Sequence, residues 1–80
     1  MKTVKVCDIS SVGVREIARR LGETEIEVVG RGSKGGEAAT LYRIGCCDVL
    51  DTNGDPVLRE ECSDEHWADL LKWWGIEEGK

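Results

Sequence analysis

The segment that decides the fold is residues 63–75, which read SDEHWADLLKWWG. It holds all three tryptophans of the chain, and Tyr42 is the only other aromatic residue. Four large apolar side chains recur here at the spacing i, i+3, i+4 and i+7, namely Trp67, Leu70, Leu71 and Trp74. This spacing places them on one face of an α-helix. Because the chain has no phenylalanine, we expect the hydrophobic core to be built on this stripe.

The residues at both ends of the segment predict where this helix begins and ends. Ser63 can accept a hydrogen bond from a backbone N–H group as the N-cap. Asp64 and Glu65 bring negative charge into the first turn, where the helix dipole favours it. Gly75 suits the left-handed conformation that ends a helix, and Ile76 can then fold back onto the helix.

A second amphipathic helix is predicted nearer the N-terminus. Ser10 or Ser11 can cap it, and Gly22 ends it. Its apolar positions again follow the helical spacing, at Val14, Ile17, Ala18 and Leu21. We expect this stripe to face the core.

Alternating apolar and polar residues predict four strands, at residues 3–9, 24–29, 38–44 and 46–50. Residues 30–36 read GRGSKGG, and we expect a flexible loop or the tip of a long hairpin there. Asn53 and Gly54 predict a tight hairpin turn, because both residues tolerate a positive φ. Residues 57–58 follow Pro56 and are expected to form a short, edge-like return strand.

The element order β-α-β-β-β-α predicts an α+β fold. We expect a small antiparallel sheet of about four strands with the two helices packed on one of its faces. A length of 80 residues fits a single domain over residues 1–80. No apolar run approaches the ~20 residues of a membrane span, and residues 1–5 lack the apolar region of a signal peptide. We therefore expect a cytoplasmic protein that does not contact a membrane.

The negative charge of the chain is concentrated in its second half. The net charge is −5. Residues 1–47 carry eight Lys or Arg and six Asp or Glu, a net charge of +2, whereas residues 48–80 carry three basic and ten acidic residues, a net charge of −7. This distribution disfavours nucleic-acid binding by the second half and favours a basic partner surface. The alternative is that the acidic surface only keeps the protein soluble.

The chain has four cysteines, Cys7, Cys46, Cys47 and Cys62. Nothing in the sequence indicates export, so we expect reduced, mostly buried thiols. In a strand, the side chains of Cys46 and Cys47 would point to opposite faces, which disfavours a disulfide between them. A zinc site would combine Cys62 and His66 with one of these two, but the paired Cys-x-x-Cys spacing is missing. Cys62 also precedes the N-cap and is spaced to pack on Trp67 as a hydrophobic staple.

Other motifs for metal binding, phosphate binding or catalysis are incomplete. Asp51, Asn53 and Asp55 alternate as in calcium loops, but no glutamate occupies the twelfth position, and a hairpin turn explains the pattern. Residues 30–36 lack the Gly-Lys-Ser/Thr ending of a phosphate-binding loop. His66 is the only histidine, and it belongs to no recognisable nucleophile motif. We therefore expect no metal, no cofactor, no catalytic residues and no enzymatic activity.

Residues 14–22 read VREIARRLG and resemble the opening helix and turn of helix-turn-helix DNA-binding proteins. That family requires a second helix next, which enters the major groove. Residues 23–30 are instead β-rich and carry three carboxylates, which phosphate groups would repel. The alternative of a DNA-binding regulator would rely on basic side chains outside this segment as well as in it, namely Arg15, Arg19, Arg20, Arg31 and Lys34.

The candidate partner-binding residues lie on and before the tryptophan helix. Trp73 falls to one side of the apolar stripe. Carboxylates precede and surround it in the sequence, at Glu60, Glu61, Asp64, Glu65 and Asp69. A partly exposed tryptophan within a charged rim is typical of a protein-interaction hot spot. The alternative is that Trp73 covers a second part of the core.

In its length, its acidic segment at residues 48–78 and its lack of catalytic motifs, the chain resembles the anti-CRISPR proteins. These are small inhibitors made by phages and mobile elements, and some imitate the charge of DNA. The resemblance implies a partner in a CRISPR-Cas surveillance complex, whose nucleic-acid channel is positively charged. The carboxylates would then pair with Lys and Arg of a Cas subunit, Trp73 would anchor the contact, and the protein itself would bind no nucleic acid. A further alternative is an accessory phage protein that self-associates through Trp73.

Overall fold

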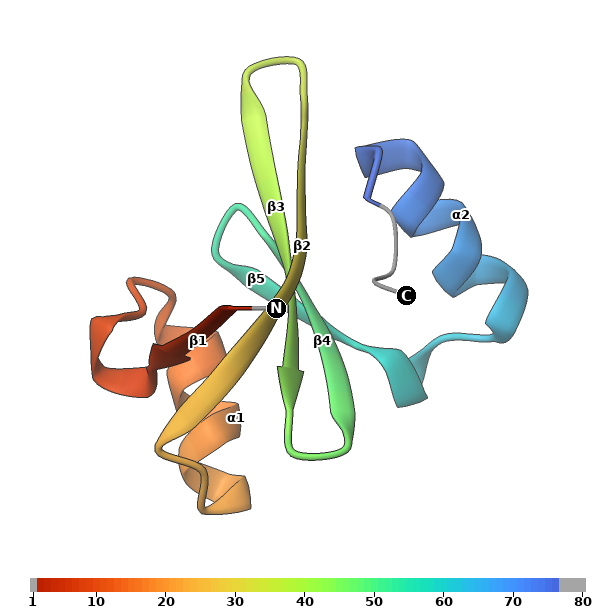
Figure 1. Ribbon diagram of the computed structural model, residues 1–80. Coiled ribbons are helices and arrows are strands. Elements are labelled where there is room, and N and C mark those ends of the chain that lie inside the picture. The colour runs from red at the N-terminus through yellow and green to blue at the C-terminus, as the bar shows by residue number, and fades with distance from the viewer. Residues whose placement is uncertain (1, 77–80) are drawn as a thin grey trace.

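In the part of the chain that the structure describes, five antiparallel strands, paired in sequence order, form one sheet that carries a helix on each side (Figure 1). The computed structural model describes residues 2–76. The strands are β1 (Lys2–Lys5), β2 (Glu25–Lys34), β3 (Glu37–Ile44), β4 (Cys47–Thr52) and β5 (Asp55–Leu58). The helices are α1 (Val12–Leu21) and α2 (Asp64–Trp74), with 3-10 turns η1 (Val6–Asp8) and η2 (Arg59–Glu61). The predicted α+β class is confirmed, with five strands in place of about four.

The glycine-rich residues 30–34 belong to β2, so the prediction of a flexible loop over residues 30–36 is wrong. The ladder between β2 and β3 continues to the pair Lys34 and Glu37, and only Gly35 and Gly36 form the tip, with φ of 60° and 83°. The alternative prediction, a long hairpin, is confirmed. Glycine and lysine have a weak propensity for strands, so these residues do not predict a strand by themselves. Backbone pairing with β3 holds them in one.

The first strand is shorter than predicted, and the return strand β5 of the hairpin that β4 and β5 form is longer than predicted. After Lys5 the chain turns into η1, although Ile9 is still buried. The predicted turn at Asn53 and Gly54 is confirmed, with φ of 52° and 92°. This turn joins β4 to a four-residue β5, which extends the predicted return strand backward to Asp55.

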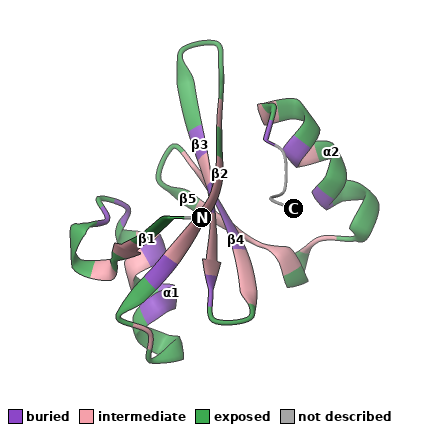
Figure 2. Cartoon of the chain, in the orientation of Figure 1, coloured by how far each residue is buried: buried purple, intermediate pink, exposed green. Residues whose placement is uncertain are grey.

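The helices pack on opposite faces of the sheet, so the expectation that both cover one face is wrong. Neighbouring residues of β4 show the division, because Val49 packs in the cluster under α1 and Leu50 in the cluster under α2. Both are fully buried. Successive side chains of a strand point to opposite faces, and β4 is apolar on both. Figure 2 shows buried positions in the sheet and on both helices.

Each helix has its own hydrophobic cluster. Under α1 the buried members are Ile9, Val14, Ile17, Ala18, Ile26, Ile44 and Val49; under α2 they are Ala39, Leu41, Leu50, Trp67, Leu71 and Ile76. The stripe of α2 is confirmed, since Leu70 and Trp74 are partly buried in the second cluster. In α1 the prediction is wrong for Leu21, which is 48% exposed. Leu21 is the last residue of α1, directly before the C-cap Gly22.

Gly32 allows the end of α2 to approach β2 closely. A Cβ atom at this position would collide with the carbonyl oxygen of Trp74 and would lie 2.8 Å from Cγ1 of Ile76. Gly32 pairs with Ala39, whose side chain lies in the cluster under α2. The missing side chain therefore leaves the room that the backbone of α2 occupies.

Both helices have the predicted serine caps. The Ser63 hydroxyl accepts a hydrogen bond from the backbone N–H of His66 at 3.1 Å, and the Ser11 hydroxyl accepts one from that of Val14 at 3.4 Å. The buried Ser11 hydroxyl also donates to the Asp51 carboxylate at 3.3 Å. At the end of α2, Gly75 has a φ of 72°, and Ile76 folds back as predicted.

The two caps are expected to differ in their contribution to stability. Ser63→Ala should lower the free energy of unfolding by about 1 kcal/mol, and Ser11→Ala by about 2 kcal/mol. The difference arises because Ser11→Ala also removes the hydrogen bond to the partly buried Asp51 carboxylate. Urea unfolding followed by circular dichroism measures both values, with the exposed Ser10→Ala as the control. A smaller loss for Ser11→Ala than for Ser63→Ala would contradict this account.

Candidate functional site

The five predicted carboxylates are all exposed on η2 and α2. We call this group the acidic surface: Glu60, Glu61, Asp64, Glu65 and Asp69. The 3-10 turn η2 leads directly into α2, so the group follows one continuous stretch of the chain. Asp64 and Glu65 occupy the first turn of α2, where negative charge also stabilises the helix.

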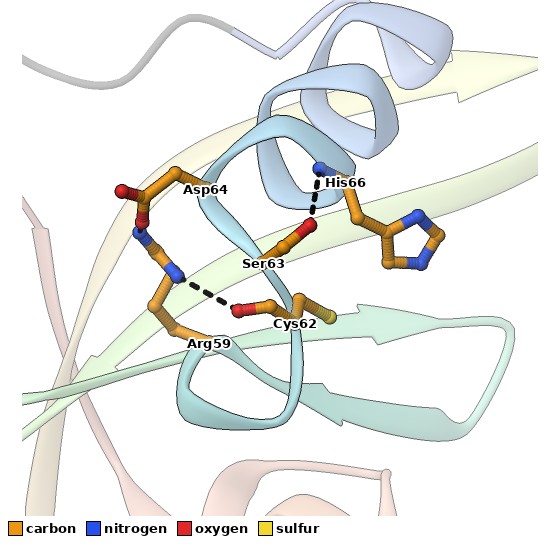
Figure 3. A network of polar contacts seen from close by, with 5 residues as sticks. All are labelled: Arg59, Cys62, Ser63, Asp64 and His66. Carbon is orange, nitrogen blue, oxygen red and sulfur yellow. Dashed lines mark hydrogen bonds and ion pairs between the residues drawn. The ribbon is translucent and has the colours of Figure 1, made fainter.

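Arg59 organises the start of α2, and sequence reasoning missed this role. Its guanidinium group forms an ion pair with Asp64 and donates a hydrogen bond to the carbonyl oxygen of Cys62 at 3.2 Å (Figure 3). The guanidinium carbon also lies 5.8 Å from the ring centroid of the buried Trp67. One carboxylate of the acidic surface is therefore already paired within the protein.

Trp73 lies at the surface, as predicted, with 57% of its area exposed. Its ring is covered in part by Lys34 of β2, whose Nζ lies 3.6 Å from the ring centroid. Trp73 lies nine positions after Asp64 in the helix, which corresponds to roughly 13 Å along the axis. Asp69 lies one turn before Trp73, whereas the other four members of the acidic surface lie in η2 and the first turn of α2. Lys34 and the exposed Lys72 add positive charge at the tryptophan end.

One basic residue of the DNA-binding alternative, Lys34, lies apart from those of α1, because it contacts Trp73 of α2. Arg15 and Arg19 line a groove of about 490 Å³ together with Lys5 of β1. Arg31 lines a neighbouring hollow, which Lys5 also lines.

The helix-turn-helix arrangement is also absent from the described chain. The element after α1 is β2, a strand, and Gly22 ends α1 with a φ of 75°. Residues 14–22 resemble a helix of that family because both are amphipathic. In this protein the apolar residues Val14, Ile17 and Ala18 of α1 are buried against the sheet.

Two groups have a pKa that is raised above its ordinary value. Burial raises the pKa of the Tyr42 phenol, and the charge of Asp51 raises it further. Desolvation raises the pKa of the Cys47 thiol, and Cys46 and Glu60 add to this shift. Both groups therefore stay protonated at neutral pH. Tyr42 lies outside the acidic surface, whereas Cys47 lies near one of its members.

The described cysteines are free thiols, but the prediction that they are mostly buried is wrong. Cys7 and Cys46 are exposed, and Cys47 and Cys62 are partly buried. Cys62 packs against the cluster that contains Trp67, which is consistent with the predicted hydrophobic staple. Within residues 2–76, no three His, Cys, Asp or Glu side chains lie close enough together to hold a metal ion.

Among residues 2–76, no helix is long and apolar enough to cross a bilayer. Comparisons of the chain with protein-family models, curated proteins and solved structures give no match. The arrangement of side chains described above is therefore the basis for a functional assignment.

Proposed function

We propose that the protein binds a basic surface of another protein through η2 and the outer side of α2. The observation that carries this proposal is the exposure of all five carboxylates of the acidic surface. Four of them, Glu60, Glu61, Glu65 and Asp69, form no salt bridge within residues 2–76. Exposed, unpaired carboxylates give this side of the molecule a negative potential that attracts Lys and Arg of a partner.

The dimensions of this side suit a protein contact. The eleven residues of α2 extend over roughly 17 Å, so one interface of about 800 Å² per partner can cover both the acidic surface and Trp73. A half-exposed tryptophan beside charged residues has the composition of a binding hot spot. In this arrangement the carboxylates guide the encounter and Trp73 anchors it.

The proposed consequence of binding is inhibition of a nucleic-acid-binding protein in the host cytoplasm. Carboxylates along a helix can occupy the Lys and Arg side chains that otherwise hold phosphate groups. The resemblance to anti-CRISPR proteins makes a Cas subunit of an RNA-guided surveillance complex the first partner to test, because its channel is positively charged.

Charge reversal on the acidic surface is expected to weaken binding at least about 10-fold, mainly through the association rate. The variant should reverse Glu60, Glu61 and Asp69 to lysine. Asp64 is left intact because its ion pair with Arg59 holds the start of α2, and Glu65 because it stabilises the first turn. The partner is captured from host lysate, identified, and its affinity is then measured at low and high salt.

A matched control carries the same charge change elsewhere, at Asp8, Glu16 and Asp55, which are exposed residues of η1, α1 and β5. Equal affinities of both triple variants would contradict the proposal, because only net charge would then matter. Displacement of nucleic acid from the captured partner tests the inhibitory role. Retardation of naked DNA by the protein at low salt would favour the DNA-binding alternative. A dimeric mass in solution that Trp73→Ala abolishes would favour self-association.

A further inference from the structure

The turn between β3 and β4 brings two thiols to the same hollow. Ile44 and Cys47 close the hairpin, and Gly45 with a φ of 62° and Cys46 form the turn between them. Since Cys46 lies outside the strand, the expectation that the two cysteine side chains point to opposite faces of a strand does not apply. Both line one hollow of about 170 Å³ between this turn and η2.

The two thiols are free and lie beside an apolar side chain and a carboxylate. Cys46 is exposed, Cys47 is partly buried, and both are free. Cys46 lies close enough to Cys47 to contribute to the raised pKa of the Cys47 thiol. Leu58 gives the hollow an apolar wall, and Glu60 brings a carboxylate to its rim.

Two common uses of paired cysteines do not fit this arrangement. The peptide bonds of residues 2–76 are trans, so the Cα atoms of Cys46 and Cys47 are about 3.8 Å apart. Ordinary disulfides need about 4.4–6.8 Å. A tetrahedral zinc site needs four ligands. Among the described residues, no three His, Cys, Asp or Glu side chains are placed to hold a metal ion together. The pair instead suits a centre that takes two sulfur ligands at a bent angle and needs no third ligand from the protein.

We propose that Cys46 and Cys47 form a dithiol site for trivalent arsenic compounds. In the reaction with an organic arsenic oxide, two arsenic–sulfur bonds form, the arsenic–oxygen bond breaks, and the two thiol protons leave with that oxygen as water. Arsenic remains trivalent, so no oxidant or reductant takes part. The organic substituent on arsenic fits the side of the hollow that Leu58 lines. This site does not depend on the proposed protein-binding function.

Phenylarsine oxide is the probe for this site. The reduced, folded protein should take up one equivalent, seen by intact mass, and should lose two titratable thiols. The adduct should survive a large excess of a monothiol, because two sulfurs hold the arsenic, and it should be released by 2,3-dimercaptopropanol. Cys46→Ser and Cys47→Ser should each reduce retention in the monothiol at least about 100-fold, since a single sulfur ligand exchanges readily.

The other two cysteines supply the controls. Cys7→Ser and Cys62→Ser should retain the adduct, because neither residue lines the hollow. Circular dichroism establishes that each variant is folded before the comparison. The proposal is overturned if wild-type protein forms no monothiol-resistant adduct, or if Cys46→Ser retains it. It is also overturned if a peptide of residues 44–49 binds as tightly as the folded protein, since the fold would then contribute nothing.

Discussion

Replacing Trp67 by alanine is expected to lower the free energy of unfolding by about 3–5 kcal/mol. Only 3% of its surface is exposed, and it shares a cluster with Leu41, Leu50 and Leu71. Removing the ring leaves a cavity that the strands of the sheet cannot close. A domain of this length has a total stability of roughly 4–12 kcal/mol, so the substitution removes a large share of it. Urea unfolding followed by circular dichroism measures the loss.

Two further substitutions test whether the position of each tryptophan decides this effect. Trp67→Phe should cost about 1–2 kcal/mol, because it keeps an aromatic ring and the Trp67 Nε1–H group has no hydrogen-bond partner in the described residues. Trp73→Ala should cost about 1 kcal/mol or less, since the side chain is 57% exposed and its ring contacts the exposed Lys34. If Trp73→Ala proved as damaging as Trp67→Ala, the division between a core tryptophan and a surface tryptophan would be wrong.

Gly32→Ala is expected to lower the free energy of unfolding by about 3 kcal/mol, a large effect for one added methyl group. The new Cβ atom would collide with the carbonyl oxygen of Trp74 and would crowd Ile76. The atom that it meets first belongs to the backbone, so rotation of a side chain cannot relieve the contact. Either β2 or the last turn of α2 must shift, and contacts in the cluster under α2 are lost. Equilibrium unfolding in urea measures the cost.

Ser33→Thr is the matched control for this substitution. It also adds one methyl group to β2, at the neighbouring exposed position, and successive residues of a strand point to opposite faces. We expect a change within about 0.5 kcal/mol for this variant. A neutral effect of Gly32→Ala would show that α2 is not held closely against β2.

Local features allowed the sequence to predict the elements themselves. The spacing of Trp67, Leu71 and Trp74, the cap at Ser63 and the stop at Gly75 define α2 within one segment. The turn at Asn53 and Gly54 was likewise predictable, because a positive φ is a property of the residues that adopt it. Asp64, Glu65 and Asp69 lie off the apolar stripe of α2, and all three are exposed. In each case the determining interactions span only a few residues along the chain.

The tertiary structure alone decided how these elements combine. That the helices cover opposite faces, and that residues 30–34 continue β2, depends on pairing with β3 and on apolar side chains of β4 that point both ways. The contact of Lys34 with Trp73 and the approach of Gly32 to the end of α2 join segments about 40 residues apart in the sequence. Periodicity and capping describe only near neighbours in the chain, so the sequence determined the helices and the exposed carboxylates, and packing decided which surface each of them forms.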